Sequence, residues 1–344
     1  MGVNITELWQ ARELSEEALK GKILAVDAPL FLYQFLSSIR QQDGTPLMDS
    51  HGSITSHLAG VLNRSAWLMS LGARPAWVFD GTPPGLKQAE LTRRRVAKEE
   101  AAAAYQKAAA EKDIDAMAKY ARRTVRLTRE MKEEAMTLVA ALGMPVIAAP
   151  AEAEAQAAHM VKQSKAWAVA SQDADTLLFG APRLARNLSA SQRRRQGLGT
   201  RQTPPELVEL SVMLEQQGLT QEQLILLGML IGTDYNQGGI KGIGPKKALK
   251  LVKEHVTGDG VSDDGRRALF AAVKWEEYFE QDWHDVYTLL AHPAVTDDYS
   301  LAWKAPDKQA VLRILVGQHE FSLERIEASL AKMTPKQRGL DAFF

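Results

Sequence analysis

Acidic residues follow several strand-like segments of the sequence, and their types and spacing suit the binding of divalent cations. The set is Asp27, Asp80, Glu152, Glu154, Asp173, Asp175 and Asp234. The first six follow four separate apolar segments, whose carboxyl ends would meet at one edge of an open parallel α/β sheet. Asp234 follows a helical segment and could join the others from outside the sheet.

So many carboxylates cannot all ionise in one cleft without cations, because like charges raise one another's pKa. Oxygen ligands without thiols or clustered imidazoles select hard cations, so we expect two Mg²⁺ ions, for which Mn²⁺ can substitute. Two metals roughly 4 Å apart can activate a water and stabilise the leaving oxygen in phosphodiester hydrolysis. A single acid at a strand end could merely solvate a turn or cap a helix, but six at matching places predict a metal site.

Four short apolar segments are expected to be the strands that position these acids. They are residues 22–27 (KILAVD), 75–80 (PAWVFD), 145–148 (PVIA) and 166–173 (AWAVASQD). They alternate little between polar and apolar residues, which is typical of strands buried on both faces of a parallel sheet. Helical stretches separate them, as in βαβ units. We therefore predict an α/β fold with a mostly parallel central sheet flanked by helices.

Two other parts of the chain are predicted to be helical. Residues 88–137 are rich in alanine and charge but carry almost no bulky apolar stripe, so their helices should stand away from the core. Beyond residue 205 we expect compact helices over residues 206–217, 221–231 and 245–255.

The composition limits the class of protein. The 344 residues include no cysteine, which excludes disulfides and thiolate chemistry, and the seven histidines show no spacing typical of a zinc site. No apolar run reaches the roughly 18 residues that span a bilayer, and no signal peptide is evident, so we expect an intracellular protein without membrane contact. The formal net charge is zero, yet basic residues gather in residues 87–132, 181–201 and 241–253. Such local charge suits contact with phosphate.

With these features the sequence closely resembles the flap endonucleases, members of the wider family of 5′ nucleases. The resemblance covers essentially the whole chain, and several motifs carry it in order. They are VDAPLFLYQFL (26–36), TSHLAG (55–60), VFDGTPPGLK (78–87), PAEAEAQ (150–156), SQDADTLLFG (171–180), LIGTDYNQGGIKGIGPKKAL (230–249) and QRGLDAFF (337–344). One departure precedes the glutamates, where AAPAEAEA, with Ala148 and Ala151, stands in place of a family pattern closer to DAPSEAEA.

The resemblance implies a PIN-like 5′ nuclease fold and a Mg²⁺-dependent, structure-specific 5′ flap endonuclease and 5′-3′ exonuclease of lagging-strand maturation and DNA repair. It implies that the seven acids hold two metals, that Lys87 and Arg94 contact the scissile phosphate, and that Tyr33 stacks near the metals. We expect Asp27, Asp80, Glu152 and Glu154 near one ion and the other three acids near the second. The rivals are a gap, bubble or Holliday-junction nuclease, and an inert clamp-binding scaffold.

The resemblance also implies three DNA-binding elements: a helical arch over residues 87–132, a helix-hairpin-helix-like element over residues 230–255 with a bound K⁺, and a wedge and 3′-flap pocket near residues 41–60. The residues expected to bind DNA are Arg40, Thr55, Arg64, Arg93, Arg95, Arg122, Arg123, Arg126, Gly242, Gly244, Lys246 and Lys247. The arch could instead be a solvated charged hairpin, and the glycine-rich element a plain turn between helices.

The last residues form a sliding-clamp-binding motif. A short helical turn would place Leu340, Phe343 and Phe344 on one side as an apolar plug, while Gln337 makes polar contacts. We therefore expect a nuclease domain over residues 1–334 and a flexible clamp-binding tail over residues 335–344. The expected partners are flap or nicked duplex DNA and the sliding clamp (PCNA). We expect the protein to be a monomer. No basic extension follows the motif, which suggests an archaeal protein that is cytoplasmic and associated with the nucleoid. If the protein were eukaryotic, we would expect it in the nucleus.

Overall fold

A seven-stranded sheet forms the centre of the molecule. The computed structural model describes residues 2–41, 44–111, 113, 126–189, 193–196, 199–256 and 262–333. The strand order is β1-β9-β6-β5-β2-β3-β4. The strands are β1 (Arg12–Glu13), β2 (Ile23–Asp27), β3 (Arg74–Phe79), β4 (Val146–Ala148), β5 (Ala168–Ala170), β6 (Arg183–Arg186) and β9 (Glu206–Glu209). Neighbours from β6 to β4 pair in parallel, whereas β9 and β1 add antiparallel pairs at one edge. The predicted α/β fold with a mostly parallel sheet is confirmed.

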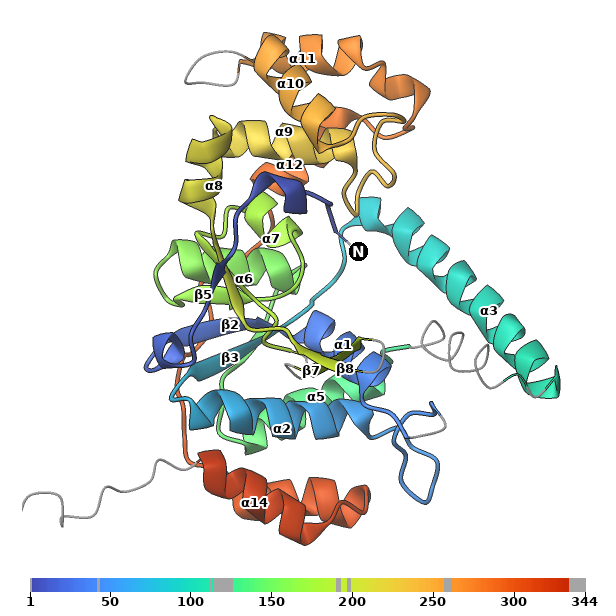
Figure 1. Cartoon of the computed structure of the whole chain (residues 1–344), viewed down its shortest axis with the longest axis vertical. Coiled ribbons are helices and arrows are strands. Elements are labelled where there is room, and N and C mark those ends of the chain that lie inside the picture. Colours follow the sequence, from blue (N-terminus) through green and yellow to red (C-terminus); the bar gives the residue numbers. More distant parts are fainter. Residues whose placement is uncertain are drawn as a thin grey trace, which may run out of the picture.

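Helices follow the strands and cover both faces of the sheet (Figure 1). They are α1 (Ala28–Ser38), α2 (Ser56–Ser70), α3 (Gln88–Glu111), α5 (Arg129–Ala141), α6 (Ala153–Lys162), α7 (Asp175–Leu178), α8 (Leu210–Gln217), α9 (Gln221–Ile231), α10 (Pro245–His255), α11 (Asp263–Ala272), α12 (Trp283–Ala291), α13 (Lys308–Leu312) and α14 (Leu323–Met333). Shorter 3-10 turns lie at η1 (Thr6–Leu8), η2 (Glu17–Leu19), η3 (Gly85–Lys87) and η4 (Trp275–Glu277), and η5 (Arg313–Gln318) is a π-helix. A separate two-stranded ribbon consists of β7 (Arg193–Gln196) and β8 (Gly199–Gln202).

Two hydrophobic cores lie on the two faces of the sheet. Successive strand residues point to opposite faces, so Leu24 and Val26 of β2 join one core and Ala25 joins the other. The first core also holds residues of α1, α2, α5 and α14, and the second holds residues of α6, α7, α9 and α10. Burial on both faces explains why these strands read as continuous apolar runs.

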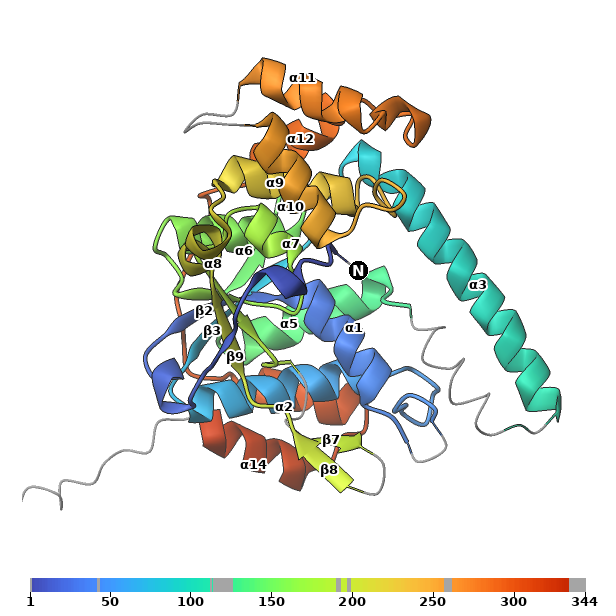
Figure 2. The same cartoon turned by 45° about the horizontal axis from the view of Figure 1, so that its top comes forward.

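Helix α3 stands away from both cores. Both views show it extending from the body as a single long helix (Figures 1 and 2). Its 24 residues are mostly alanine and charged side chains, which have high helix propensity but little apolar surface to bury. The expectation of a projecting helix is therefore confirmed for residues 88–111, whereas residues 112 and 114–125 lie outside the described part of the chain.

Residues 206–217 differ from the prediction that they form one helix. Its first four residues form the strand β9, and only Leu210–Gln217 is helical. Leu207 and Val208 pack into opposite cores, as neighbouring residues of a strand do. Four residues are too few for the sequence to show this alternation between the two faces of the sheet. Among the described residues, no helix is long and apolar enough to cross a membrane.

Candidate active site

The acids predicted to bind metal gather at the carboxyl edge of the sheet. Asp27 ends β2, Asp80 directly follows β3, and Glu152 caps the start of α6, whose first turn contains Glu154. Asp173 and Asp175 lie between β5 and the first turn of α7. All but Asp175 line one cavity of about 630 Å³, together with Tyr33, Lys87 and Arg94. The structure therefore brings the predicted metal ligands and the predicted catalytic residues together.

Backbone hydrogen bonds join the turn that carries Asp80 to the loop that carries Glu152. Gly81 N donates to Ala151 O at 2.7 Å, and Thr82 N donates to Pro150 O at 3.1 Å. Ala153 N donates to Asp80 Oδ1 at 2.7 Å. A Cβ atom on Gly81 would overlap the carbonyl oxygens of this loop, so only glycine allows the two segments to approach so closely. The two acids are thus fixed relative to each other by the main chain.

The beginning of the chain completes the other side of the site. Gly2 N donates to Asp173 Oδ2 at 3.2 Å, and Val3 N donates to Asp175 Oδ1 at 2.6 Å. A Cβ atom on Gly2 would overlap the carboxylates of Asp173 and Asp175, so a larger residue there would displace these side chains. These contacts orient both aspartates.

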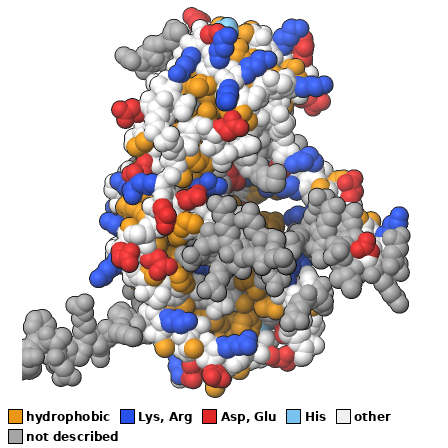
Figure 3. Space-filling view, viewed as in Figure 1, with side chains coloured by type: hydrophobic (Ala, Val, Ile, Leu, Met, Phe, Trp, Pro, Cys, Tyr) orange, Lys and Arg blue, Asp and Glu red, His pale blue; other side chains and the backbone are white. Residues whose placement is uncertain are grey.

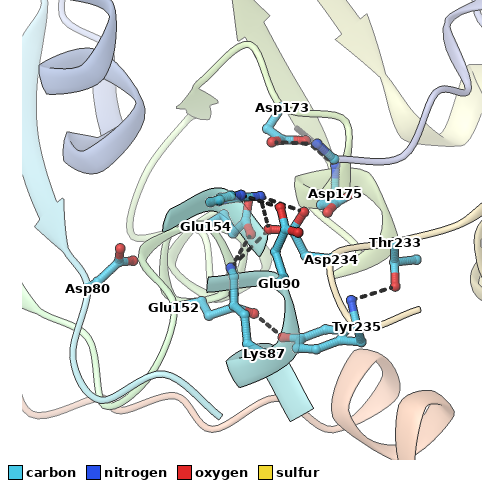
Figure 4. A network of polar contacts seen from close by, with 12 residues as sticks. Asp80, Lys87, Glu90, Glu152, Glu154, Asp173, Asp175, Thr233, Asp234 and Tyr235 are labelled. Atoms are coloured by element: carbon cyan, nitrogen blue, oxygen red, sulfur yellow. Dashed lines mark hydrogen bonds and ion pairs between the residues drawn. The ribbon is translucent and has the colours of Figure 1, made fainter. Parts of the chain in front are cut away.

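Two cations, Lys87 (Figure 4) and Arg94, reach the acidic cluster from the start of the projecting helix. Lys87 Nζ pairs with Glu152 Oε1, lies 3.2 Å from Asp234 Oδ2 and lies 4.0 Å from Glu154 Oε1. Arg94 Nη2 donates to both carboxylate oxygens of Asp234 at 2.8 and 2.9 Å. Both cations therefore lie among the acids and carry donors of the kind that bind phosphate.

Burial and crowding change the acidity of the cluster. Burial raises the pKa of Asp27 to about 7, despite a hydrogen bond from Ser171. Burial also raises the pKa of Asp80, and burial with the charge of Asp173 raises the pKa values of Glu154 and Asp175. Burial opposes ionisation of Asp234 too, but Lys87 and Arg94 outweigh it and lower its pKa. Burial and crowding thus favour the protonated forms of Asp27, Asp80, Glu154 and Asp175.

This donor set fits hard divalent cations. All the candidate ligands are carboxylate oxygens, which Mg²⁺ and Mn²⁺ prefer. Within the described part of the chain, Glu154, Asp173 and Asp175 form a group whose ligand oxygens all lie within 4.8 Å of one another. This geometry places Glu154 beside the two aspartates.

Several polar residues of the site were not predicted. Ser171 donates to Asp27 Oδ2 at 2.7 Å, Tyr235 donates to Glu152 Oε2, and Lys132 donates to the carbonyl oxygen of Asp80. Glu90 pairs with Arg94, and Lys98 lies over the ring of Tyr33 at 4.8 Å from its centre. Ser171 and Tyr235 stand two residues or fewer from a predicted ligand, which is the one signal in the sequence that could have indicated them.

The residues predicted to bind DNA lie on several surfaces. Arg93 and Arg95 are exposed on α3, and Arg126 approaches Glu99 of the same helix. Gly242 has a φ of +78°, Gly244 caps α10, and Lys246 and Lys247 are exposed in the first turn of α10. Lys and Arg side chains gather over α10 and α11 (Figure 3).

The remaining candidates are more enclosed or lie outside the described part of the chain. Thr55 is buried at the start of α2, and Arg64 lies over the Trp67 ring, where burial lowers its pKa to about 10. Arg40 Nη1 donates to Gly44 O at 2.7 Å, which holds the turn after α1. Six of the predicted binding residues lie outside the described part of the chain: Arg122, Arg123, Gln337, Leu340, Phe343 and Phe344.

Comparisons with known proteins agree with this site. The sequence matches the XPG N-terminal domain over residues 3–101 and the XPG I-region over residues 143–234. It is 46% identical to flap endonuclease 1 of Hyperthermus butylicus over 357 residues, covering 100% of this chain and 99% of that protein. It is 45% identical to flap endonuclease 1 of Staphylothermus marinus over 359 residues, covering both chains completely.

Solved structures give the same result. Flap endonuclease-1 from Methanococcus jannaschii superimposes with a TM-score of 0.75 at 37% identity, covering 96% of this chain and 98% of that one. The catalytic core of Rad2 in complex with a DNA substrate gives a TM-score of 0.67 at 24% identity, covering 94% and 96%, which shows a shared fold. The full-length identity and the shared architecture show that the chain belongs to the flap endonuclease 1 family of XPG/Rad2 nucleases.

Proposed function

We propose that this chain hydrolyses a phosphodiester near the junction of a 5′ flap with duplex DNA, using two divalent ions held by its seven acids. Flap endonuclease activity follows from the family to which the chain belongs. The observation that carries the finer proposal is the meeting of the acids with Lys87 and Arg94 around one cavity. A weaker 5′ exonuclease activity would use the same site, and both would act in lagging-strand maturation and repair.

The residues of the site divide the work. When bound, two ions of Mg²⁺ or Mn²⁺ supply an activated water and stabilise the leaving oxygen. Asp27, Asp80, Glu152 and Asp234 complete the ligand set around the group of Glu154, Asp173 and Asp175. Lys87 and Arg94 bind the scissile phosphate, and the 40% exposed ring of Tyr33 offers a surface on which a base can stack. The products carry a 5′-phosphate and a 3′-hydroxyl.

The surrounding elements bind the DNA without reading its sequence. We assign the arch to residues 87–132, and Arg93, Arg95, Arg122, Arg123 and Arg126 to its phosphate contacts. The turn between α9 and α10 has the glycines and the helix N-terminus that favour a phosphate, with Lys246 and Lys247 beside it, and a K⁺ ion would assist there. Arg40, Thr55 and Arg64 would contact the 3′ side of the junction. The Rad2 core was solved with a DNA substrate and human GEN1 with Holliday junction DNA, and their shared fold supports a DNA partner for this chain.

The tail adds a protein partner. We propose that Gln337, Leu340, Phe343 and Phe344 bind the sliding clamp (PCNA), and that residues 1–334 act as one nuclease domain in a monomer. The organisms of the matched relatives support an archaeal protein that works in the cytoplasm at the nucleoid.

Cleavage by two acid-deficient variants tests the proposal. Asp80→Ala and Asp173→Ala should each lower Mg²⁺-dependent cleavage of a 5′-flap substrate at least roughly a hundredfold, because each removes a metal ligand. DNA binding, measured by fluorescence anisotropy, should persist in both. Normal cutting by either variant would refute the metal-site assignment.

A panel of DNA substrates distinguishes a flap endonuclease from nucleases that prefer bubbles or four-way junctions. Wild-type protein with Mg²⁺ should cut a 5′ flap faster than a bubble, a four-way junction or a nicked duplex, close to the base of the flap. Faster cutting of the bubble or the four-way junction would instead favour a bubble or Holliday-junction nuclease.

A further inference from the structure

A buried glutamate lies beside the acidic cluster but is not one of its predicted metal ligands. Glu90 stands in the first turn of α3, and its side chain is 2% exposed. It accepts hydrogen bonds from Arg94 Nε and from Arg93 Nε, the latter at 3.1 Å. Figure 4 shows its carboxylate beside Asp234 in the centre of the polar network. The two arginines offset the cost of burying this carboxylate, because a buried charge without partners is strongly unfavourable.

Its main partner, Arg94, is held from two sides. Glu90 on the same helix accepts from Nε, and Asp234, in the loop after α9, accepts from Nη2 through both of its oxygens. Two carboxylates from separate elements therefore fix the plane of the guanidinium group. Within the part of the chain that the structure describes, Nη1 of Arg94 has no hydrogen-bond partner, and Arg94 lines the cavity.

We propose that Glu90 is a positioning residue that orients the Arg94 guanidinium toward the scissile phosphate. This inference rests on the proposed function, in which Arg94 binds that phosphate. An arginine side chain loses considerable rotamer freedom when it is fixed, and Glu90 fixes it before the substrate arrives. The free Nη1 edge is then available to a phosphate oxygen while the other donors stay bound.

A purely structural role for Glu90 predicts different behaviour. An acid in the first turn of a helix interacts favourably with the helix dipole, and pairs three or four residues apart stabilise the helix itself. The dipole effect and the Glu90–Arg93 pair do not require the Arg94 side chain, and any contribution of the Glu90–Arg94 pair to the stability of α3 would appear in thermal unfolding. A double-mutant cycle separates the two roles.

The experiment measures single-turnover cleavage of a 5′-flap duplex with Mg²⁺ and enzyme in excess, and DNA affinity by anisotropy. The variants are Glu90→Gln, Arg94→Ala, their combination, and Glu90→Asp, which keeps the charge on a shorter side chain. Glu99→Gln is the matched control, since Glu99 lies on the same helix, is 55% exposed and approaches Arg95 at 3.9 Å.

We expect Glu90→Gln to lower the single-turnover rate roughly tenfold or more in the wild-type background, because a small misplacement of a catalytic group is costly. Its effect should fall below about twofold in the Arg94→Ala background, with DNA affinity changed less than about twofold throughout. Glu90→Asp should recover part of the rate, and Glu99→Gln should keep all of it. Thermal unfolding of each variant checks that the fold persists.

Equal losses in both backgrounds, or a normal rate for Glu90→Gln, would overturn the inference. Failure of the proposed function would appear differently, as normal cutting by Arg94→Ala itself. If Glu90→Gln does not fold, the same cycle is measured with Glu90→Asp. A fall in the cleavage rate that occurs with Arg94 present and vanishes in the Arg94→Ala background supports positioning. The same fall in both backgrounds refutes it.

Discussion

The phenol of Tyr235 donates a hydrogen bond to Glu152 Oε2, while Lys87 donates to Oε1 of the same carboxylate. Both oxygens of a proposed metal ligand are thus oriented by neighbouring side chains. Burial and the charge of Glu152 raise the pKa of Tyr235, so the phenol keeps its proton and remains a donor at neutral pH. Partners of this kind tune a metal ligand through its orientation and basicity.

Tyr235→Phe removes this hydrogen bond and little else. We expect the Mg²⁺ concentration for half-maximal cleavage to rise about tenfold, because Glu152 loses its orientation. Calorimetric titration with Mn²⁺ should show a parallel loss of affinity in the absence of DNA. Tyr287→Phe is the matched control, since Tyr287 donates to Glu222 Oε1 at 3.0 Å away from the site. An unchanged metal requirement in Tyr235→Phe would show that Glu152 does not depend on the phenol.

Gly81→Ala should damage the site through the backbone. The added methyl would overlap the carbonyl oxygens of Ala149 and Pro150, so one of the two segments must move. We expect a loss of about 1–3 kcal/mol in the free energy of unfolding, measured by urea denaturation, together with slower flap cleavage. Gly85→Ala is the control, because no atom lies within 4 Å of a methyl there. Equal behaviour of the two variants would contradict the close approach.

A pH-dependent contribution to stability is expected at Asp49. Asp49 Oδ2 pairs with His319 Nδ1 at 3.0 Å, and this contact, with backbone hydrogen bonds from Ser53 and His51, lowers the pKa of Asp49. A lowered pKa in the folded state gives stability that is present above the ordinary aspartate pKa and lost as the pH falls through the lowered value. Asp49→Asn should therefore melt below the wild type at pH 7, and the gap should narrow as the pH is lowered from 7 through the ordinary aspartate pKa of about 4. A gap that stays constant over that range would exclude ionisation of Asp49 as its cause.

Removal of residues 337–344 tests the clamp-binding tail, which lies outside the described residues. We expect the truncated chain to keep its basal cleavage rate and to lose stimulation by the sliding clamp, because the apolar plug is gone. Phe343→Ala with Phe344→Ala should have the same effect without shortening the chain. Equal stimulation of the full and truncated chains would remove the proposed role of the tail.

The strands and their acids could be predicted because burial on both faces leaves a strong sequence pattern. The apolar runs at β2 and β3 mark their strands, and Asp27 and Asp80 follow directly. Strands β6 and β9 were not predicted, because each has only four residues and charged ends, as in RLAR and ELVE. Their place in the sheet depends on partners that are distant in sequence.

The polar partners within the site were harder to predict than its ligands. Glu90 looks like an ordinary charged residue on a charged helix, and only the fold shows that it is buried against Arg94. Lys132 reaches the carbonyl oxygen of Asp80 from a helix 52 positions further along the chain, and no local spacing indicates such a contact. The metal ligands could be predicted from their residue types and positions in the sequence. The side chains that hydrogen-bond to them could not, because tertiary packing brings them together.

The backbone bonds between Gly81 and Ala151 and between Thr82 and Pro150 have an evolutionary consequence. A main-chain amide donates and a main-chain carbonyl accepts whatever side chain the residue carries. Side chains at Thr82 and Ala151 can therefore change without separating Asp80 from Glu152, whereas Gly81 must remain a glycine. At Ala151, for example, a different side chain would leave the hydrogen bond from Gly81 N to the carbonyl oxygen in place.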